Sequence, residues 1–310
     1  MTRLSKLMFA AAATVAIPSA ALAQDGMEGE ASAEGSSEMA PDPMTPPPDP
    51  NATGETSSSA AGGLFTAPGK LTIAGSTVNI GLFPDNAGKP ISLAPSIFYG
   101  VNEKLVVGLT HDGGTTPWTP RPSVGVTLIT VAGIPFPALQ GFGICVTGDD
   151  GGCGKVYNNV GVDALYLLKS DAKFTLAAHP AIDVRSFDPF TLALRVGVLG
   201  NYAVNDKVNI AFDPRISIGL TERDFQNDVI DIPVWAWYKA TPELGVYLHT
   251  GFAESLSDFG DSYQIPLGLG ANYAINEQLT AGLDFHFLNM LGSDGGTDAK
   301  MIGLRAIYNL

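Results

Sequence analysis

Twelve ionisable residues between positions 163 and 305 are the side chains best suited to bind or sort a charged solute. They comprise five aspartates, four arginines and three histidines, so the set is close to neutral at pH 7. Inside a closed β-barrel, such a belt forms a constriction that sets which solutes pass. Alternatively, it is a structural network that pairs charges inside a narrow barrel. The belt consists of Asp163, His179, Asp183, Arg185, Arg195, Asp213, Arg215, Asp231, His249, Asp284, His286 and Arg305.

Opposite charges in this set are spaced like cross-strand neighbours of antiparallel hairpins. The residue numbers of two such neighbours sum to twice the centre of the turn between them. This rule predicts paired charges at a similar height in the barrel, with Asp183, Arg185 and His286 near them. The near-neutral belt predicts no strong ion selectivity, and the histidines would add positive charge below about pH 6.5. The predicted pairs are Asp163–His179, His179–Arg195, Arg195–Asp213, Arg215–Asp231, Asp231–His249 and Asp284–Arg305.

The elements that position this belt are strands, because apolar and polar residues alternate along the chain. In residues 174–185, Phe174, Leu176 and Ile182 fall on one face, whereas His179 and Asp183 fall on the other. The polar faces hold mostly small residues with isolated charges, and a water-exposed sheet would carry more Lys and Glu. The pattern therefore predicts a membrane barrel that is apolar outside and polar inside. It disfavours the alternative of a soluble β-sandwich or a lipocalin-like barrel.

A tyrosine followed by a short polar turn recurs along the chain, as in residues 98–105, 201–208 and 272–279. Successive tyrosines from 166 onward are separated by 36, 36, 35 and 35 residues, which is the length of one membrane-spanning hairpin. By strand phase these side chains lie on the apolar face. They predict an aromatic girdle at the periplasmic membrane interface. The girdle consists of Tyr99, Tyr166, Tyr202, Tyr238, Tyr273 and Tyr308.

Twelve strands fit this pattern. Because their number is even, the N- and C-terminal ends of the barrel domain lie on the same side of the membrane. The first tyrosine interval is 67 residues, nearly twice the others, so an antiparallel barrel of fourteen strands is the alternative. The expected strands are 70–82, 90–100, 104–112, 155–168, 173–184, 189–202, 207–220, 228–239, 243–253, 262–274, 278–290 and 298–310.

The N-terminus resembles a secretory signal peptide over residues 1–23, with a basic start, an apolar stretch and a small-residue cleavage site. Residues 24–63 hold eight acids, no base and several prolines, so they predict a disordered acidic linker. The barrel domain is residues 64–310. The net charge of −14 and the absence of a basic cluster exclude a nucleic-acid-binding protein. Apart from the extreme N-terminus, apolar runs are too short for transmembrane helices.

The longest connection, residues 113–154, contains both cysteines of the chain. Cys145 and Cys153 flank a glycine- and aspartate-rich turn, and in an oxidising compartment such a pair predicts a disulfide. The apolar part of this connection either folds at the barrel mouth or forms an extra hairpin. No residue spacing indicates a metal or cofactor site, and none is predicted. His111 has outward parity at a strand end, but no serine is placed to form a catalytic pair with it, so no enzyme activity is expected.

At the level of strand pattern, tyrosine-turn repeats and final strand, residues 64–310 resemble the bacterial outer-membrane β-barrel superfamily. Members usually end in an aromatic residue that the barrel-assembly machinery reads, whereas this chain ends with Tyr308-Asn309-Leu310. The resemblance implies a Gram-negative outer membrane, contact with its lipids and with that machinery, and a periplasmic linker. The function expected is a passive, porin-like channel for small solutes. The alternative is a structural or adhesive barrel with a blocked lumen that acts through its extracellular loops.

Overall fold

The computed structural model describes residues 66–310 except for a few short segments, so the predicted signal peptide and linker lie outside the described residues. No helix in the described part of the chain is long and apolar enough to cross a membrane. The segments that are not described are 75–77, 85, 112–124, 132–133, 141–142, 148–155, 158, 225, 258, 261–262 and 294, and only the backbone is described at 86 and 125–140.

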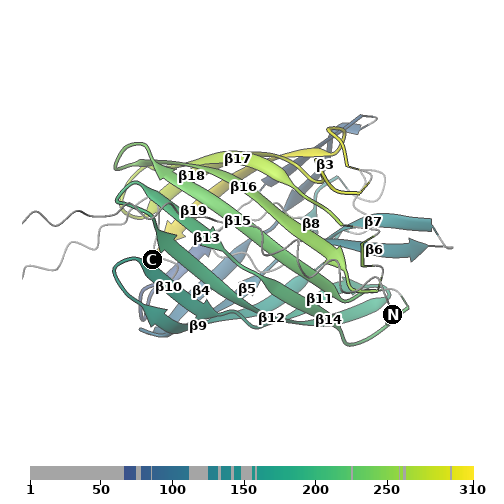
Figure 1. Cartoon of the computed structure of the whole chain (residues 1–310), viewed down its shortest axis with the longest axis horizontal. Helices are drawn as coiled ribbons and strands as arrows, with labels where there is room; N and C mark the ends of the chain where they lie inside the picture. The colour runs from purple at the N-terminus through teal and green to yellow at the C-terminus, as the bar shows by residue number, and fades with distance from the viewer. Residues whose placement is uncertain are drawn as a thin grey trace, which may run out of the picture. The chain divides into compact units, whose positions relative to one another are not determined.

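The described residues form a closed antiparallel barrel of twelve wall strands, which confirms the predicted fold (Figure 1). Four wall strands are each split into two elements, and the final strand pairs with both halves of the first. That pairing closes the barrel. The wall elements are β1 (Leu71–Ala74), β2 (Val78–Phe83), β3 (Asn86–Leu93), β4 (Ser96–Asn102), β5 (Leu105–Thr110), β9 (Val160–Ser170), β10 (Phe174–Ala178), β11 (Ala181–Phe187), β12 (Phe190–Ala203), β13 (Val208–Phe212), β14 (Arg215–Gly219), β15 (Val229–Lys239), β16 (Leu244–Ser255), β17 (Leu267–Ala274), β18 (Leu279–Phe287) and β19 (Lys300–Asn309).

The fourteen-strand alternative is wrong, because the long connection adds no strand to the wall. Its apolar part forms a separate two-stranded sheet of β6 (Gly125–Val131) and β7 (Ile134–Gln140). The wall strand β5 pairs directly with β9, so no gap remains there for two more strands. Further along, the short β8 (Ile144–Cys145) pairs with β3. The connection therefore holds an extra hairpin, but one outside the barrel sheet.

The wall is inverted relative to a soluble protein, as the alternation predicts. Large apolar side chains point outward and are exposed, for example Val162 at 60% and Leu269 at 61%. Residues with the opposite parity are buried, and many of them are polar or charged. A β-strand has only two faces, so one alternating pattern places the apolar residues outside and the belt inside.

The six tyrosines all point outward, with exposures from 38% to 53%. Four of them, Tyr99, Tyr202, Tyr238 and Tyr273, precede by three residues the side chain that organises a short turn. The sixth, Tyr308, lies in the last strand and pairs with Ile73 of β1. The tyrosines thus mark the barrel end that carries the short turns, and the membrane girdle remains a prediction.

Those short turns share one hydrogen-bonding device. In the turn after β12, the side-chain oxygen of Asn205 accepts hydrogen bonds from the backbone N–H groups of Lys207 (2.9 Å) and Val208 (2.9 Å). Asp171, Thr241 and Asn276 do the same two and three residues ahead. Short polar side chains favour this local bonding, which explains why the polar turn recurs in the sequence.

Replacing Asn205 with alanine is expected to lower barrel stability by about 0.5–1.5 kcal/mol, because two backbone donors lose their protein acceptor. Urea unfolding of the refolded barrel measures the loss. Asn205→Asp keeps an acceptor oxygen at the same place and serves as the control. An equal loss in both variants would mean that the turn does not depend on this oxygen.

Candidate functional site: the charged belt

The predicted belt lies on the inner face of the barrel. Ten of its twelve members are buried, and Arg185 and Asp231 are partly buried. Nine of the twelve gather into two groups on different parts of the wall, and Tyr247 joins the second group. The first, called the Asp163 cluster, contains Asp163, His179, Asp183, Arg195 and Asp213. The second, called the Asp284 cluster, contains Tyr247, His249, Asp284, His286 and Arg305.

Asp163 on β9 is the centre of the first cluster. Its Oδ1 accepts a hydrogen bond from Arg195 Nη2 (3.2 Å) and lies 3.2 Å from His179 Nε2. Its Oδ2 accepts from the hydroxyl of Thr110 (2.5 Å). Arg195 Nη2 also donates to Asp183 Oδ1 at 2.8 Å. A buried carboxylate needs such partners, because burying an unpaired charge is costly.

His179, between β10 and β11, connects Asp163 with Asp213, which lies between β13 and β14. Its Nδ1 lies 3.0 Å from Asp213 Oδ1. Both residues lie at breaks in the wall, and each is followed by a proline, Pro180 or Pro214. Proline cannot donate a ladder hydrogen bond, which explains why the strand stops there. The wall remains bonded across the breaks, for example from His179 N to Gly197 O at 2.9 Å.

Arg215 extends the cluster toward β15. Its guanidinium lies 3.6 Å from Asp213 and 3.7 Å from Asp231. The register places Arg215 directly opposite Asp231, so this predicted pair is confirmed. Arg185 bonds instead to the hydroxyl of Ser217 and to the backbone oxygen of Asn227 (3.4 Å).

The Asp284 cluster spans β16 to β19. Asp284 Oδ1 lies 2.5 Å from His286 Nδ1, and Oδ2 lies 3.2 Å from His249 Nε2. Tyr247 donates its hydroxyl to Asp284 Oδ2 (2.8 Å) and accepts a hydrogen bond from Arg305. Tyr247 was not predicted. Its inward parity in the strand 243–253 was the available signal, since a tyrosine on the polar face differs from the six outward ones.

Other predicted pairs are close in space but are not cross-strand partners. Asp163 contacts His179 but lies opposite Ala181, and Asp231 lies opposite Ala253 rather than His249. Arg195 lies opposite Ala181 and Ser217, not His179 or Asp213. Arg305 lies opposite Gly282 rather than Asp284. The predicted turn centres were mostly one or two residues from the real ones, and an error of one residue shifts each partner by two.

Glycines on intervening strands make the belt contacts possible. Gly268 on β17 lies opposite both His249 and His286, and a Cβ there would overlap His249 Nε2. Gly270 on β17 has the same role between Tyr247 and Asp284, because a Cβ there would overlap Tyr247. Side chains two strands apart can meet only where the residue between them is small, and Asp163 reaches Arg195 across Ala181. The belt therefore uses the absence of a Cβ at two positions.

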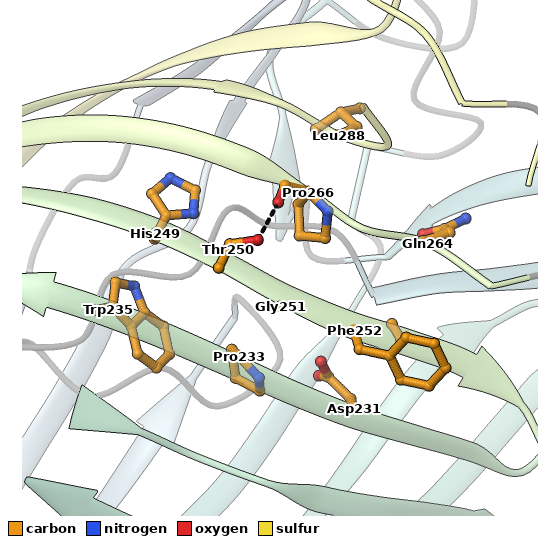
Figure 2. Close-up of a pocket in the computed structure, with 11 residues that line it drawn as sticks. Asp231, Pro233, Trp235, His249, Thr250, Gly251, Phe252, Gln264, Pro266 and Leu288 are labelled. Carbon is orange, nitrogen blue, oxygen red and sulfur yellow. Dashed lines mark hydrogen bonds between the residues drawn. The ribbon is translucent and has the colours of Figure 1, made fainter. Parts of the chain in front are cut away.

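A small cavity of about 30 Å³ lies beside His249, between the prolines Pro233 on β15 and Pro266 before β17 (Figure 2). Figure 2 shows Thr250 bonded to the backbone oxygen of Pro266, at 2.9 Å. Asp231 also lines the cavity. Its size suits about one water molecule, and Asp231, His249 and Thr250 are polar groups in a lining that is otherwise mostly apolar.

Two predictions lie at the barrel mouth. Cys145 is buried against Leu288 and Met301, but Cys153 lies outside the described residues, so the disulfide remains a prediction. His111 is buried, contrary to its expected outward position. Its ring nitrogens contact the backbone oxygen of Pro95 (2.5 Å) and the hydroxyl of Tyr157 (2.9 Å), which favours a structural role.

No family model matches the sequence, and no curated protein does. Similar solved structures include the NanC porin, which is 9% identical, with 77% of this chain and 98% of that chain covered and a TM-score of 0.49. The KdgM porin is 8% identical, with the same coverage and a TM-score of 0.47. OmpT, an outer-membrane protein of Vibrio cholerae, is 11% identical, with 78% and 98% covered and a TM-score of 0.37. The chain is a closed twelve-stranded antiparallel barrel, and the similar solved structures named here are two porins and an outer-membrane protein.

Proposed function

We propose that this chain is an outer-membrane barrel of a Gram-negative bacterium and provides a passive path for small solutes. The inverted wall carries the proposal. Its exposed outward face is apolar and suits lipid, while its inward face is polar and charged and suits solutes. A closed barrel is also one of the two architectures that satisfy every backbone group in a membrane. The positive and negative charges of the belt are nearly balanced, so the belt does not indicate which solute passes.

The remaining parts of the proposal follow from this orientation. The six exposed tyrosines lie at one membrane interface, and the short turns beside them face the periplasm. Residues 1–23 direct export, and residues 24–63 form a periplasmic linker. The cysteine pair lies in the long connection on the opposite, extracellular side. The final strand is read by the barrel-assembly machinery despite its terminal leucine.

The belt is the constriction in this proposal, and Arg215 and Asp231 form its predicted and observed cross-strand pair. Asp231 also lines the cavity shown in Figure 2, so removing this pair enlarges an existing space. A second candidate is a structural or adhesive barrel with a blocked lumen. The low exposure of the belt, for example 1% at Asp163 and 3% at Arg215, favours this second candidate.

Single-channel recording of the refolded chain in planar bilayers tests the proposal. The wild type is expected to give discrete conductance steps. The Arg215→Ala, Asp231→Ala double variant is expected to give larger ones, on the order of twofold, because two side chains leave the narrowest section. The matched control is Arg223→Ala, Asp228→Ala, which removes an ion pair from the loop before β15.

Unchanged steps in the control and altered steps in the belt variant would support the channel. If the folded barrel, identified by its heat-modifiable gel band, conducts in neither form, the channel is rejected. The structural barrel then takes its place, and the segment 113–154 becomes the region to test for partner binding.

A further inference from the structure

Three side chains of the Asp284 cluster are of types that coordinate metal ions, a role that the proposed passage of solutes does not require. His249, Asp284 and His286 each offer one ligand atom, and these atoms all lie within 4.8 Å of one another. All three residues are buried, with exposures of 2%, 6% and 1%. We infer that His249 and His286, held by Asp284, bind one divalent transition-metal ion of the Zn²⁺ class. The inference is independent of whether the barrel conducts.

Strand register assembles this group. His249 on β16, Gly268 on β17 and His286 on β18 lie in one row of directly paired residues. Gly268 has no side chain, so the two imidazoles approach each other over it, with ring centroids 5.5 Å apart. Asp284 lies two residues before His286 on the same inward face of β18. The two histidines are 37 positions apart in the sequence, so no short metal-ligand motif predicts this site.

The contacts of His286 fit those of a metal ligand. His286 Nδ1 faces Asp284 Oδ1 at 2.5 Å, so the ring proton belongs on Nδ1 and a lone pair remains on Nε2. Metal-binding histidines usually donate their second nitrogen to a carboxylate in this way. Among the described residues, His286 Nε2 is buried without a hydrogen-bond partner, whereas His249 Nε2 lies 3.2 Å from Asp284 Oδ2. A buried acceptor without a partner is costly, and a bound cation satisfies it.

His179 provides the contrast within the same belt. Its two ring nitrogens contact Asp213 at 3.0 Å and Asp163 at 3.2 Å, both with hydrogen-bonding geometry. It is therefore saturated by protein partners. His179 is as buried as the other two histidines, which makes it a matched control for their loss.

The donor set defines the class of ion. Two imidazoles beside a carboxylate that orients them suit Zn²⁺, Cu²⁺ and Ni²⁺, whereas Ca²⁺ and Mg²⁺ prefer oxygen ligands. Tyr247 donates to Asp284 Oδ2 and fixes the carboxylate. Arg305 bonds to Tyr247, and its positive charge opposes a cation nearby. Removing that charge with Arg305→Gln is therefore expected to strengthen metal binding severalfold.

The experiment uses the full chain refolded in detergent without a histidine tag. The protein is equilibrated with Zn²⁺ and dialysed against a weak chelator, and bound zinc is measured by mass spectrometry. One ion per barrel is expected in the wild type and in His179→Gln. His249→Gln and His286→Gln are each expected to lower affinity at least about tenfold, since each removes a ligand.

A second measurement needs no variant. Cu²⁺ bound to the wild-type barrel is expected to give an electron paramagnetic resonance spectrum with coupling to two imidazole nitrogens. Absence of a stoichiometric ion, a copper spectrum without nitrogen coupling, or equal binding in all three histidine variants would each overturn the inference. The heat-modifiable gel band establishes folding in each sample, so a misfolded variant is not read as a lost ligand.

Discussion

Leu269→Arg is expected to destabilise the folded barrel by about 2–4 kcal/mol if the outward face lies in lipid. Leu269 points outward from β17, is 61% exposed, and pairs with Leu248 and Phe285 in the middle of the wall. A charged side chain there must enter the hydrocarbon layer. At a water-exposed position the same substitution usually changes stability by less than about 0.5 kcal/mol. Urea unfolding in phospholipid vesicles, followed by fluorescence of the three tryptophans, measures the difference.

Ile275→Arg is the matched control for this experiment. Ile275 belongs to the same hairpin, has the same outward parity and is 54% exposed, but it lies beyond Tyr273 in the turn. The cost of arginine falls to about 0–1 kcal/mol near the interface. A large loss at Leu269 with a small loss at Ile275 supports a membrane-embedded wall bounded by the tyrosines. Equal, small losses at both positions would place the outward face in water and contradict the membrane proposal.

The wall was predictable because one local signal repeats in every hairpin. Alternation fixes which face each residue joins, and the polar turn side chains cap the hairpins through bonds that span only three residues, as at Asn205. The breaks within strands were less evident. Residues 207–220 were expected as one strand, but Pro214 cannot donate to the ladder and divides it into β13 and β14.

The belt contacts were only partly predictable, because they depend on register and on neighbours two strands away. Sequence parity placed all twelve belt residues on the inner face, but it could not fix which carboxylate meets which cation. Asp284 was assigned to Arg305, yet it contacts both histidines and reaches Arg305 only through Tyr247. The contacts that cross β17 require Gly268 and Gly270 between the partners. A glycine in a strand indicates that there is room beside the backbone. It does not indicate which neighbouring side chain fills that room.

Asp163→Ala is expected to cost about 3–5 kcal/mol of barrel stability, because it breaks a buried charge network by removing one partner. The carboxylate accepts hydrogen bonds from Thr110 and Arg195 and contacts His179, at an exposure of 1%. Without it, Arg195 keeps Asp183 and His179 keeps Asp213, but the buried hydroxyl of Thr110 and the guanidinium of Arg195 each lose an acceptor. Urea unfolding and the fraction of heat-modifiable protein after refolding measure the loss.

Asp228→Ala tests whether this cost comes from burial rather than from losing any ion pair. Asp228 accepts two hydrogen bonds from Arg223, at 2.5 and 2.9 Å, in a loop. Those bonds lower the pKa of Asp228, so the carboxylate is ionised and paired at neutral pH. Exposed pairs contribute little, because water solvates the charges when the pair is broken. A large loss at Asp163 beside a small loss at Asp228 assigns the stability to the buried network. Similar losses would mean that the belt is hydrated and that its charges are free to face a solute.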